Sequence, residues 1–304
     1  MRTARFTSQL LWALTAGLAL ALNAAADNSP AAPVPPKGAP ERAPDKSAYN
    51  LFNPTPRALM RELTTDRPDK TESPYTVDAG HFQIEMDLAS YTHDRDTANR
   101  ADLKADSLAV AALNLKAGLL NQVELQLMVD TYTWVRVQDR GAVARQSGFG
   151  DLTTRLKINC WGNDGGTTAL ALMPFVKFPT SQHDLGNHAV EGGLIVPLAV
   201  ELPLGWGMGL MTEFDVMQDA DGTGRHSEFI NSVTFSHDIV GRLSGYLEFY
   251  SQVIARHEVP WIGTADFGLT YRLTEDLQLD AGVSLGVTRP AADVNPFLGL
   301  SLRF

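Results

Sequence analysis

Seven histidines are the first side chains in this sequence that could carry out chemistry. An imidazole can bind a metal ion or transfer a proton, and His183 and His188 stand close to Asp184 in the chain. The histidines lie in or beside polar, loop-like segments, and no fixed spacing of several ligands accompanies them. We therefore predict no catalytic residue, no metal site and no cofactor. A hydrolase-type enzyme stays an alternative, because distant residues can assemble a catalytic geometry.

Charged side chains that alternate with apolar ones are the stronger candidates for a site that binds or passes a solute. They are Glu85, Asp87, Glu124, Asp130, Asp151, Arg155, Lys157, Lys177, Glu213, Asp215, Glu248 and Asp266. In residues 122–135, for example, Val123, Leu125 and Leu127 alternate with Glu124 and Gln126. A period of two places successive side chains on opposite faces of a β-strand, so these charges share one face of each strand.

Twelve such segments follow one another along the chain. They run at roughly 81–91, 105–117, 122–135, 150–160, 168–178, 190–202, 206–217, 228–237, 242–252, 262–272, 277–287 and 296–304. Short connections at 118–121, 161–167, 203–205, 238–241 and 273–276 alternate strictly with long polar ones at 92–104, 136–148, 179–189, 218–227, 253–261 and 288–295. This alternation is typical of an even number of antiparallel strands that cross a membrane with both termini on the short-turn side.

The fold class predicted is therefore all-β, a transmembrane antiparallel β-barrel of about 12 strands. A water-soluble β-sandwich would also show a period of two. The sandwich is disfavoured because aromatic side chains such as Trp206, Phe214 and Tyr271 stand near strand ends on the apolar faces, as in an interfacial girdle. The last strand ends on Phe304, an ending that resembles the recognition strand of bacterial outer-membrane proteins. That resemblance implies the outer-membrane lipid and the barrel assembly machinery as partners.

Composition is compatible with this fold and excludes other classes. The chain has 304 residues, 44% of them apolar, a net charge of −10, and a single cysteine, Cys160. The acidic balance argues against a nucleic-acid partner, and one cysteine cannot form an internal disulfide or a multi-cysteine metal site. By alternation, Cys160 is expected on the outward face near a short turn.

Four regions are expected along the chain. Residues 1–26, with Arg2 and Arg5 before an apolar run and three alanines at its end, have the form of a secretory signal peptide. Its removal would leave 23 basic against 35 acidic residues, a balance of −12. Residues 27–60 are rich in Pro and Ala and are expected to form an extended, poorly ordered periplasmic spacer. Residues 61–79 form an extended segment at the periplasmic mouth, and 80–304 form the barrel.

Three sequence stretches carry a family resemblance. They are the run from Leu63 to Glu85 containing Asp-Arg-Pro-Asp-Lys-Thr-Glu-Ser-Pro-Tyr, the run Gly150-Asp-Leu-Thr-Thr-Arg-Leu-Lys157, and the run Met173-Pro-Phe-Val-Lys-Phe-Pro-Thr180. Over about residues 50–304 the chain resembles the bacterial outer-membrane transporters of the MetA pathway of phenol degradation. The resemblance implies an outer-membrane barrel that passes small, in part aromatic, molecules.

Two further expectations concern the barrel interior. Asp66, Arg67, Asp69 and Glu72 stand in the extended segment before the first strand, and we expect them to enter the periplasmic mouth, with Arg67 pairing acidic lumen residues. The alternative is that this segment only caps the first strand at the surface. Because acids outnumber bases on the inward faces, an open lumen is expected to prefer cations or neutral solutes to anions. Pairing of these charges could instead seal the barrel.

Overall fold

The computed structural model describes residues 45–95, 103–183, 185–219, 222–255 and 261–304. The expected signal peptide and residues 27–44 of the expected spacer lie outside these ranges. No helix among the described residues is long and apolar enough to cross a membrane.

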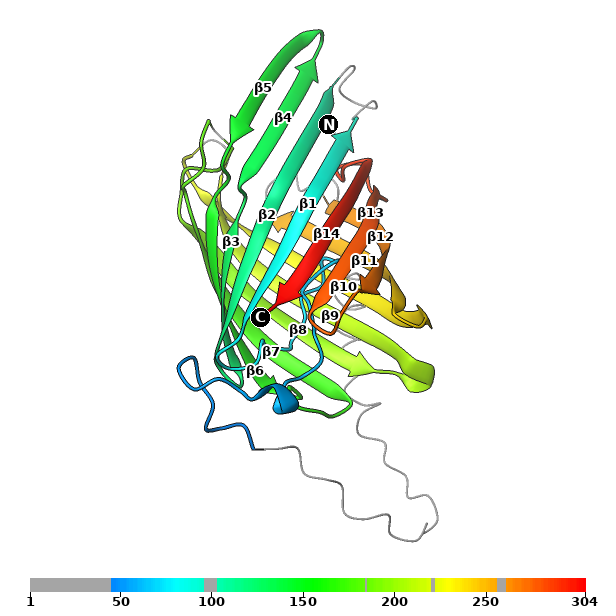
Figure 1. Ribbon diagram of the computed structural model, residues 1–304. Helices are drawn as coiled ribbons and strands as arrows, with labels where there is room; N and C mark the ends of the chain where they lie inside the picture. The colour runs from blue at the N-terminus through cyan, green and yellow to red at the C-terminus, as the bar shows by residue number, and fades with distance from the viewer. Residues whose placement is uncertain (1–44, 96–102, 184, 220–221, 256–260) are drawn as a thin grey trace.

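In the described part of the chain, fourteen β-strands form one antiparallel sheet that closes on itself (Figure 1). They are β1 Phe82–Asp94, β2 Lys104–Leu120, β3 Val123–Val129, β4 Tyr132–Asp139, β5 Ala142–Gly148, β6 Leu152–Trp161, β7 Thr168–Phe178, β8 Glu191–Glu201, β9 Trp206–Gln218, β10 Arg225–Val240, β11 Leu243–Ala255, β12 Trp261–Arg272, β13 Leu277–Gly286 and β14 Val294–Arg303. Two short 3-10 turns, η1 Arg57–Leu59 and η2 Pro203–Gly205, complete the described regular structure. Closure comes from the pairing of β1 with both β2 and β14, which leaves no open sheet edge around the barrel.

The barrel wall itself has 12 strands, as the sequence predicts. β3 and β4 are two parts of one wall strand, because both pair with β2, at 113–120 and 104–110 respectively. β6 takes up the pairing with β3, while β5 pairs with β4 as the return strand of a hairpin. The prediction of a long loop at 136–148 is therefore wrong, because those residues form most of this β4–β5 hairpin. The hairpin extends beyond the barrel wall (Figure 1).

The alternation of burial along the strands is the reverse of that in a water-soluble protein. On β11, Leu247 is 58% exposed, whereas the next residue, Glu248, is 2% exposed. On β3, Leu125 is 39% exposed and Glu124 is fully buried. Apolar side chains therefore cover the outside and charged side chains fill the inside, which is the distribution required of a barrel whose outer surface contacts lipid.

Part of the expected spacer is packed on the barrel rather than loosely extended. Residues 45–60 cross the end that carries the short turns, where Asn50 forms a β-bridge with Leu120. Lys46 is 4% exposed and forms ion pairs with Asp78 and Asp164 at 3.2 and 2.7 Å. Proline content alone does not show that these side chains have specific partners on the barrel.

The lipid-facing surface provides a test of the fold. Leu172 points outward at the middle of β7 and is 38% exposed. Replacing it with arginine should cost about 2–4 kcal/mol of unfolding free energy, because the charge would lie near the bilayer midplane. The change Leu204→Arg, in a turn where the leucine is 90% exposed, should change stability by less than about 0.5 kcal/mol. Urea unfolding in phospholipid vesicles measures both, and equal losses for the two variants would contradict this orientation.

Candidate functional site in the barrel lumen

Residues 61–79 enter the barrel from the short-turn end, where Arg61 contacts Asn121 and Asp164, and are called here the plug segment. The segment has no regular secondary structure, so it cannot satisfy its own amide groups. Inward side chains of the strands do this instead. The backbone amide of Asp66 donates to Glu85 at 3.1 Å, and the amide of Val77 donates to Glu124 at 2.5 Å.

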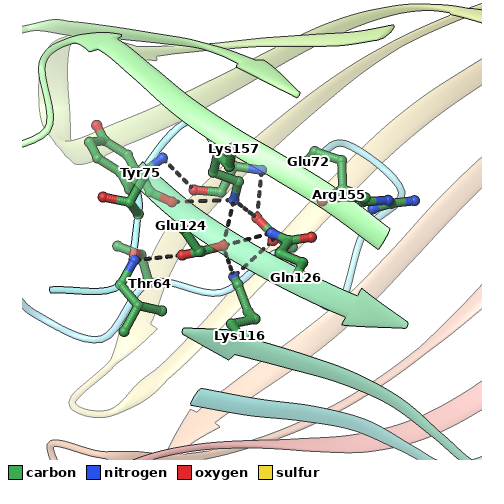
Figure 2. A network of polar contacts seen from close by, with 12 residues as sticks. Thr64, Glu72, Tyr75, Lys116, Glu124, Gln126, Arg155 and Lys157 are labelled. Atoms are coloured by element: carbon green, nitrogen blue, oxygen red, sulfur yellow. Dashed lines mark hydrogen bonds and ion pairs between the residues drawn. The ribbon is translucent and has the colours of Figure 1, made fainter. Parts of the chain in front are cut away.

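Asp66 is the most heavily coordinated charge of the plug segment. Its carboxylate accepts contacts from Lys116 at 2.8 Å, from Lys157 at 2.5 Å and from the amide of Gln126 at 2.8 Å. These three side chains come from β2, β6 and β3, and they converge on one point of the lumen (Figure 2). Burial opposes ionisation of Asp66, but the two ammonium groups hold its pKa well below the usual range.

Lys116 and Lys157 are themselves almost fully buried, at 3% and 0% exposed. Besides Asp66, Lys116 contacts Glu85 at 2.8 Å and Glu124 at 3.6 Å. A buried ammonium group is tolerated only when such partners surround it. Two lysines and three carboxylates thus form one cluster that fixes the plug segment to neighbouring strands.

Arg67 contacts the adjacent part of the wall. Its guanidinium forms ion pairs with Asp87 at 2.7 Å and Asp280 at 2.8 Å, and it lies 5.9 Å from the ring centre of Phe297. Gly299 makes room for it, since a Cβ atom at that position would lie 2.2 Å from an Arg67 nitrogen. The arginine therefore joins β1, β13 and β14 around the point where the barrel closes.

The next part of the plug segment continues the same contacts along β10 to β13. Lys70 pairs with Asp266 at 2.9 Å, and the amides of Lys70 and Thr71 donate to Glu248 at 2.9 and 2.7 Å. The hydroxyls of Thr71 and Ser232 are 2.7 Å apart. Glu72 forms an ion pair with Arg155 of β6.

The inner wall beside these contacts is apolar. Met173, Ile195, Met211 and Ile230 form a buried cluster on β7 to β10, with Phe175 and Tyr250 packed against it. The plug segment lies close to this wall, because the amide of Glu72 is 3.4 Å from the sulfur of Met211 and the Lys70 amine is 4.8 Å from the Tyr250 ring centre. The lumen therefore offers a charged surface and an apolar surface on either side of one segment.

Comparison with known proteins decides the family. The family model described as "Putative MetA-pathway of phenol degradation" matches residues 65–304. The chain belongs to this family. No curated protein sequence matches it.

One solved structure shares this fold, and others are similar to it in part. An outer-membrane channel from Pseudomonas putida F1 is 17% identical, with a TM-score of 0.58, over 79% of this chain and 100% of the channel. The NanC porin is 10% identical, with a TM-score of 0.48, over 72% of this chain and 98% of the porin. The translocator domain of the autotransporter NalP from Neisseria meningitidis is 10% identical, with a TM-score of 0.44, over 74% and 88% of the two chains. This member of the MetA-pathway family thus has the fold of an outer-membrane β-barrel.

The match to the MetA-pathway family begins one residue before Asp66, so it includes most of the plug segment as well as the barrel. Seven of the twelve predicted lumen residues contact the plug segment: Glu85, Asp87, Glu124, Arg155, Lys157, Glu248 and Asp266. The other five do not join these contacts. Asp130 is exposed at the break between β3 and β4, Asp151 accepts from the Ser181 amide, Lys177 pairs with Glu191, and Glu213 and Asp215 lie together on β9.

Sequence reasoning missed several partners of the plug segment. Lys116, Gln126, Ser232 and Asp280 all contact it, yet none was selected as a site residue. The alternation of residues along each strand indicates only that these four side chains lie on the inward face. It does not indicate which inward residues a separate segment will contact.

The described residues contain no group of three His, Cys, Asp or Glu side chains placed to hold a metal ion. Gly282-Val-Ser284-Leu-Gly286 has the spacing of a nucleophile elbow, but it lies in the extended strand β13 instead of a sharp strand-to-helix turn. The Ser284 hydroxyl accepts a hydrogen bond from Lys70 at 2.8 Å, and the Lys70 amine also pairs with Asp266. The serine is thus part of the plug contacts.

The pKa of Asp69 leads to a prediction of how the docking of the plug segment depends on pH. Burial, together with the nearby charges of Glu72 and Asp66, raises the pKa of Asp69 to about 7. A carboxyl whose pKa is raised in the docked state favours docking while it is protonated, and this stabilisation is lost as the pH rises through about 7. Hydrogen exchange of residues 61–79, corrected for the intrinsic rate, should therefore show weaker protection at pH 8 than at pH 6.

Two variants test whether Asp69 is responsible. Asp69→Asn should abolish much of the difference between pH 6 and pH 8, because the amide does not ionise. Asp139→Asn, an equal change at an exposed position of the β4–β5 hairpin, should keep the difference. If Asp69→Asn retained the full pH dependence, Asp69 would not be its source.

Proposed function

We propose that the protein is an outer-membrane channel for the passive passage of small molecules, and that the plug segment gates it. The observation that carries the proposal is that the plug segment is held in the lumen by ion pairs and hydrogen bonds to inward side chains. Such contacts are reversible, and the chain's single cysteine excludes an internal disulfide to the wall. Aromatic molecules are the class that the description of the MetA-pathway family suggests.

The orientation belongs to the same proposal. We place the short turns and both termini in the periplasm, as is usual for outer-membrane barrels with short and long connections at opposite ends. Phe304, 61% exposed, stacks with Phe82 at 6.0 Å between ring centres and exchanges backbone hydrogen bonds with it. The final strand is therefore paired up to its last residue, which suits an entry signal for the barrel assembly machinery.

A reversible covalent lock tests the gating. Because the Thr71 and Ser232 hydroxyls are 2.7 Å apart, cysteines at these positions should form a disulfide that holds the plug segment in the lumen. In a Cys160→Ser background, oxidised Thr71→Cys/Ser232→Cys protein should show low, steady conductance in planar bilayers. Reduction with dithiothreitol should increase the conductance or the frequency of opening.

The Cys160→Ser protein and the two single-cysteine variants are the controls, and dithiothreitol should leave their conductance unchanged. Equal conductance of the oxidised and reduced double variant, with the disulfide verified by mass, would refute gating by the plug segment. An absence of conductance and of solute flux in every state would instead support a sealed structural barrel.

Charge on the inner wall predicts ion selectivity. Glu213 and Asp215 form no ion pair with a basic side chain among the described residues, and their carboxyls are hydrogen-bonded to each other, so the pair adds net negative charge beside the apolar wall. Reversal potentials in a potassium chloride gradient should show a modest preference for cations. Glu213→Gln/Asp215→Asn should reduce this preference, whereas Glu275→Gln, 90% exposed at the short-turn end, should not. Anion selectivity of the native protein would contradict the prediction.

A further inference from the structure

On the outward face of β1, β2, β4 and β5, the side chains change from apolar and aromatic to charged toward the end of the β4–β5 hairpin. Val110 and Tyr132 are register partners on β2 and β4, and Leu108 and Trp134 form the next outward pair. Tyr91 of β1 is the register partner of Leu108, so Tyr91, Tyr132 and Trp134 form an aromatic tier on this face. Asp106 and Arg136 form the following outward pair, so charge begins two residues beyond the aromatic side chains. Two residues of a strand correspond to about 7 Å.

The next tier consists of Lys104, Asp106, Arg136 and Arg145. It is basic, although the protein as a whole carries a net charge of −10. Arg136 is the direct register partner of Arg145 on β5, and Lys104 follows on the same face as the partner of Gln138. Asp106 is the one acid among the described residues of this tier. Three permanent positive charges therefore face outward against a single negative one.

Arg136 and Arg145 lie opposite each other across the β4–β5 pair, an arrangement that is unfavourable for two like charges. Asp106 partly compensates Arg136, whose guanidinium donates to it at 3.2 Å and to Gln138 at 3.0 Å. No hydrogen bond or ion pair joins the Arg145 side chain to another described residue. An anion between the two guanidinium groups would remove the repulsion, and arginine is well suited to phosphate.

The tier is also ordered before any ligand binds. Asp106 accepts hydrogen bonds from the Tyr91 hydroxyl at 2.8 Å and contacts the His93 ring at 2.8 Å, in addition to Arg136. These contacts fix the carboxylate and, through it, the position of Arg136. The remaining N–H groups of the guanidinium are then free to meet an outside acceptor.

The location favours a lipid over a soluble partner. Aromatic side chains of membrane barrels lie at the headgroup level, so charges about 7 Å further out lie among the polar headgroups. The hairpin that carries Arg136 and Arg145 extends the wall beyond the ends of β13 and β14 (Figure 1). Its basic face is thus continuous with the lipid-facing surface below it.

We propose that Lys104, Arg136 and Arg145, ordered by Asp106, bind the phosphate of an outer-leaflet lipid headgroup of the lipid A type. This assignment of leaflet depends on the orientation given under the proposed function. The binding itself does not depend on channel activity. Conductance measurements can therefore fail or succeed independently of lipid binding.

Native mass spectrometry of the full chain in dodecyl maltoside, titrated with diphosphoryl lipid A, tests the proposal. The native protein should retain one or more lipid A molecules and should bind dipalmitoylphosphatidylcholine at least tenfold more weakly. Arg136→Gln/Arg145→Gln should weaken lipid A binding at least tenfold. Arg140→Gln, the same change in the hairpin turn four residues further from the membrane than Arg136, should bind lipid A as the native protein does.

Equal lipid A binding by the native and double glutamine proteins would overturn the proposal, as would equal binding of lipid A and phosphatidylcholine by the native protein. Heat-modifiable gel migration verifies that each variant is folded. Should the double glutamine variant not fold, Arg136→Lys/Arg145→Lys keeps the charge but loses the planar donors, and it should bind more weakly than the native protein. Unchanged binding by the lysine variant would then count against phosphate recognition by arginine.

The leaflet has its own test. The change Ala142→Cys, in a Cys160→Ser background, places a cysteine at the first residue of β5, beside the turn of the hairpin and the proposed lipid site. It should react with a membrane-impermeant maleimide on intact cells. Labelling only after the outer membrane is opened would place the hairpin in the periplasm and overturn the outer-leaflet assignment, while leaving phosphate binding to be judged by mass spectrometry.

Discussion

Pairing of buried charge is the constraint on which the interior of this barrel depends. Lys116 and Lys157 project from neighbouring parts of the wall into a space where they are 3% or less exposed, and an uncompensated ammonium group there would be costly. The plug segment supplies Asp66 between them. In return, the wall supplies carboxylates that accept the amides of the plug segment, which no strand or helix satisfies. Neither component of the lumen is complete without the other.

The same constraint explains why the plug segment follows the path it does. Its charged residues alternate in sign along Asp66, Arg67, Asp69 and Lys70, and their partners follow one another around the wall, from Lys116 on β2 to Asp280 on β13 and Asp266 on β12. At the short-turn end, Gly118 lets the chain approach the wall closely, since a Cβ atom there would lie 2.1 Å from the carbonyl oxygen of Asp78. Charge fixes the direction of the segment, and the absence of a side chain at Gly118 allows its backbone to reach the wall.

The sequence was sufficient for the wall because one physical rule controls it. Lipid on one side and polar groups on the other impose a period of two on every strand, so the number of wall strands and most turns could be predicted. The β4–β5 hairpin was missed because it rises past the lipid, where neither face has to be apolar. Because it contains charged residues such as Arg136, Asp139 and Arg145, this stretch was predicted to be a polar loop.

The lumen could be predicted only in part, for a different reason. The alternation along the strands predicted that Glu85 and Asp266 point inward. It did not predict that Glu85 accepts the Asp66 amide or that Asp266 pairs with the Lys70 amine. Arg67 and Asp280 are separated by 213 positions in the chain, and a single sequence carries no record of such a pair. Local rules decide the face of a side chain, whereas the partner depends on the closed three-dimensional barrel.

The position of the plug segment in the chain has a consequence for gating. It directly precedes β1, whose first residue, Phe82, pairs with the C-terminal Phe304. Release of the ion pairs would therefore leave the segment tethered to the rim at the point where the barrel closes. Docking would then be an intramolecular event at high effective concentration, in which individually weak contacts suffice to hold the segment in the lumen. In the gating that we propose, the tether would allow the segment to return to the lumen after each opening.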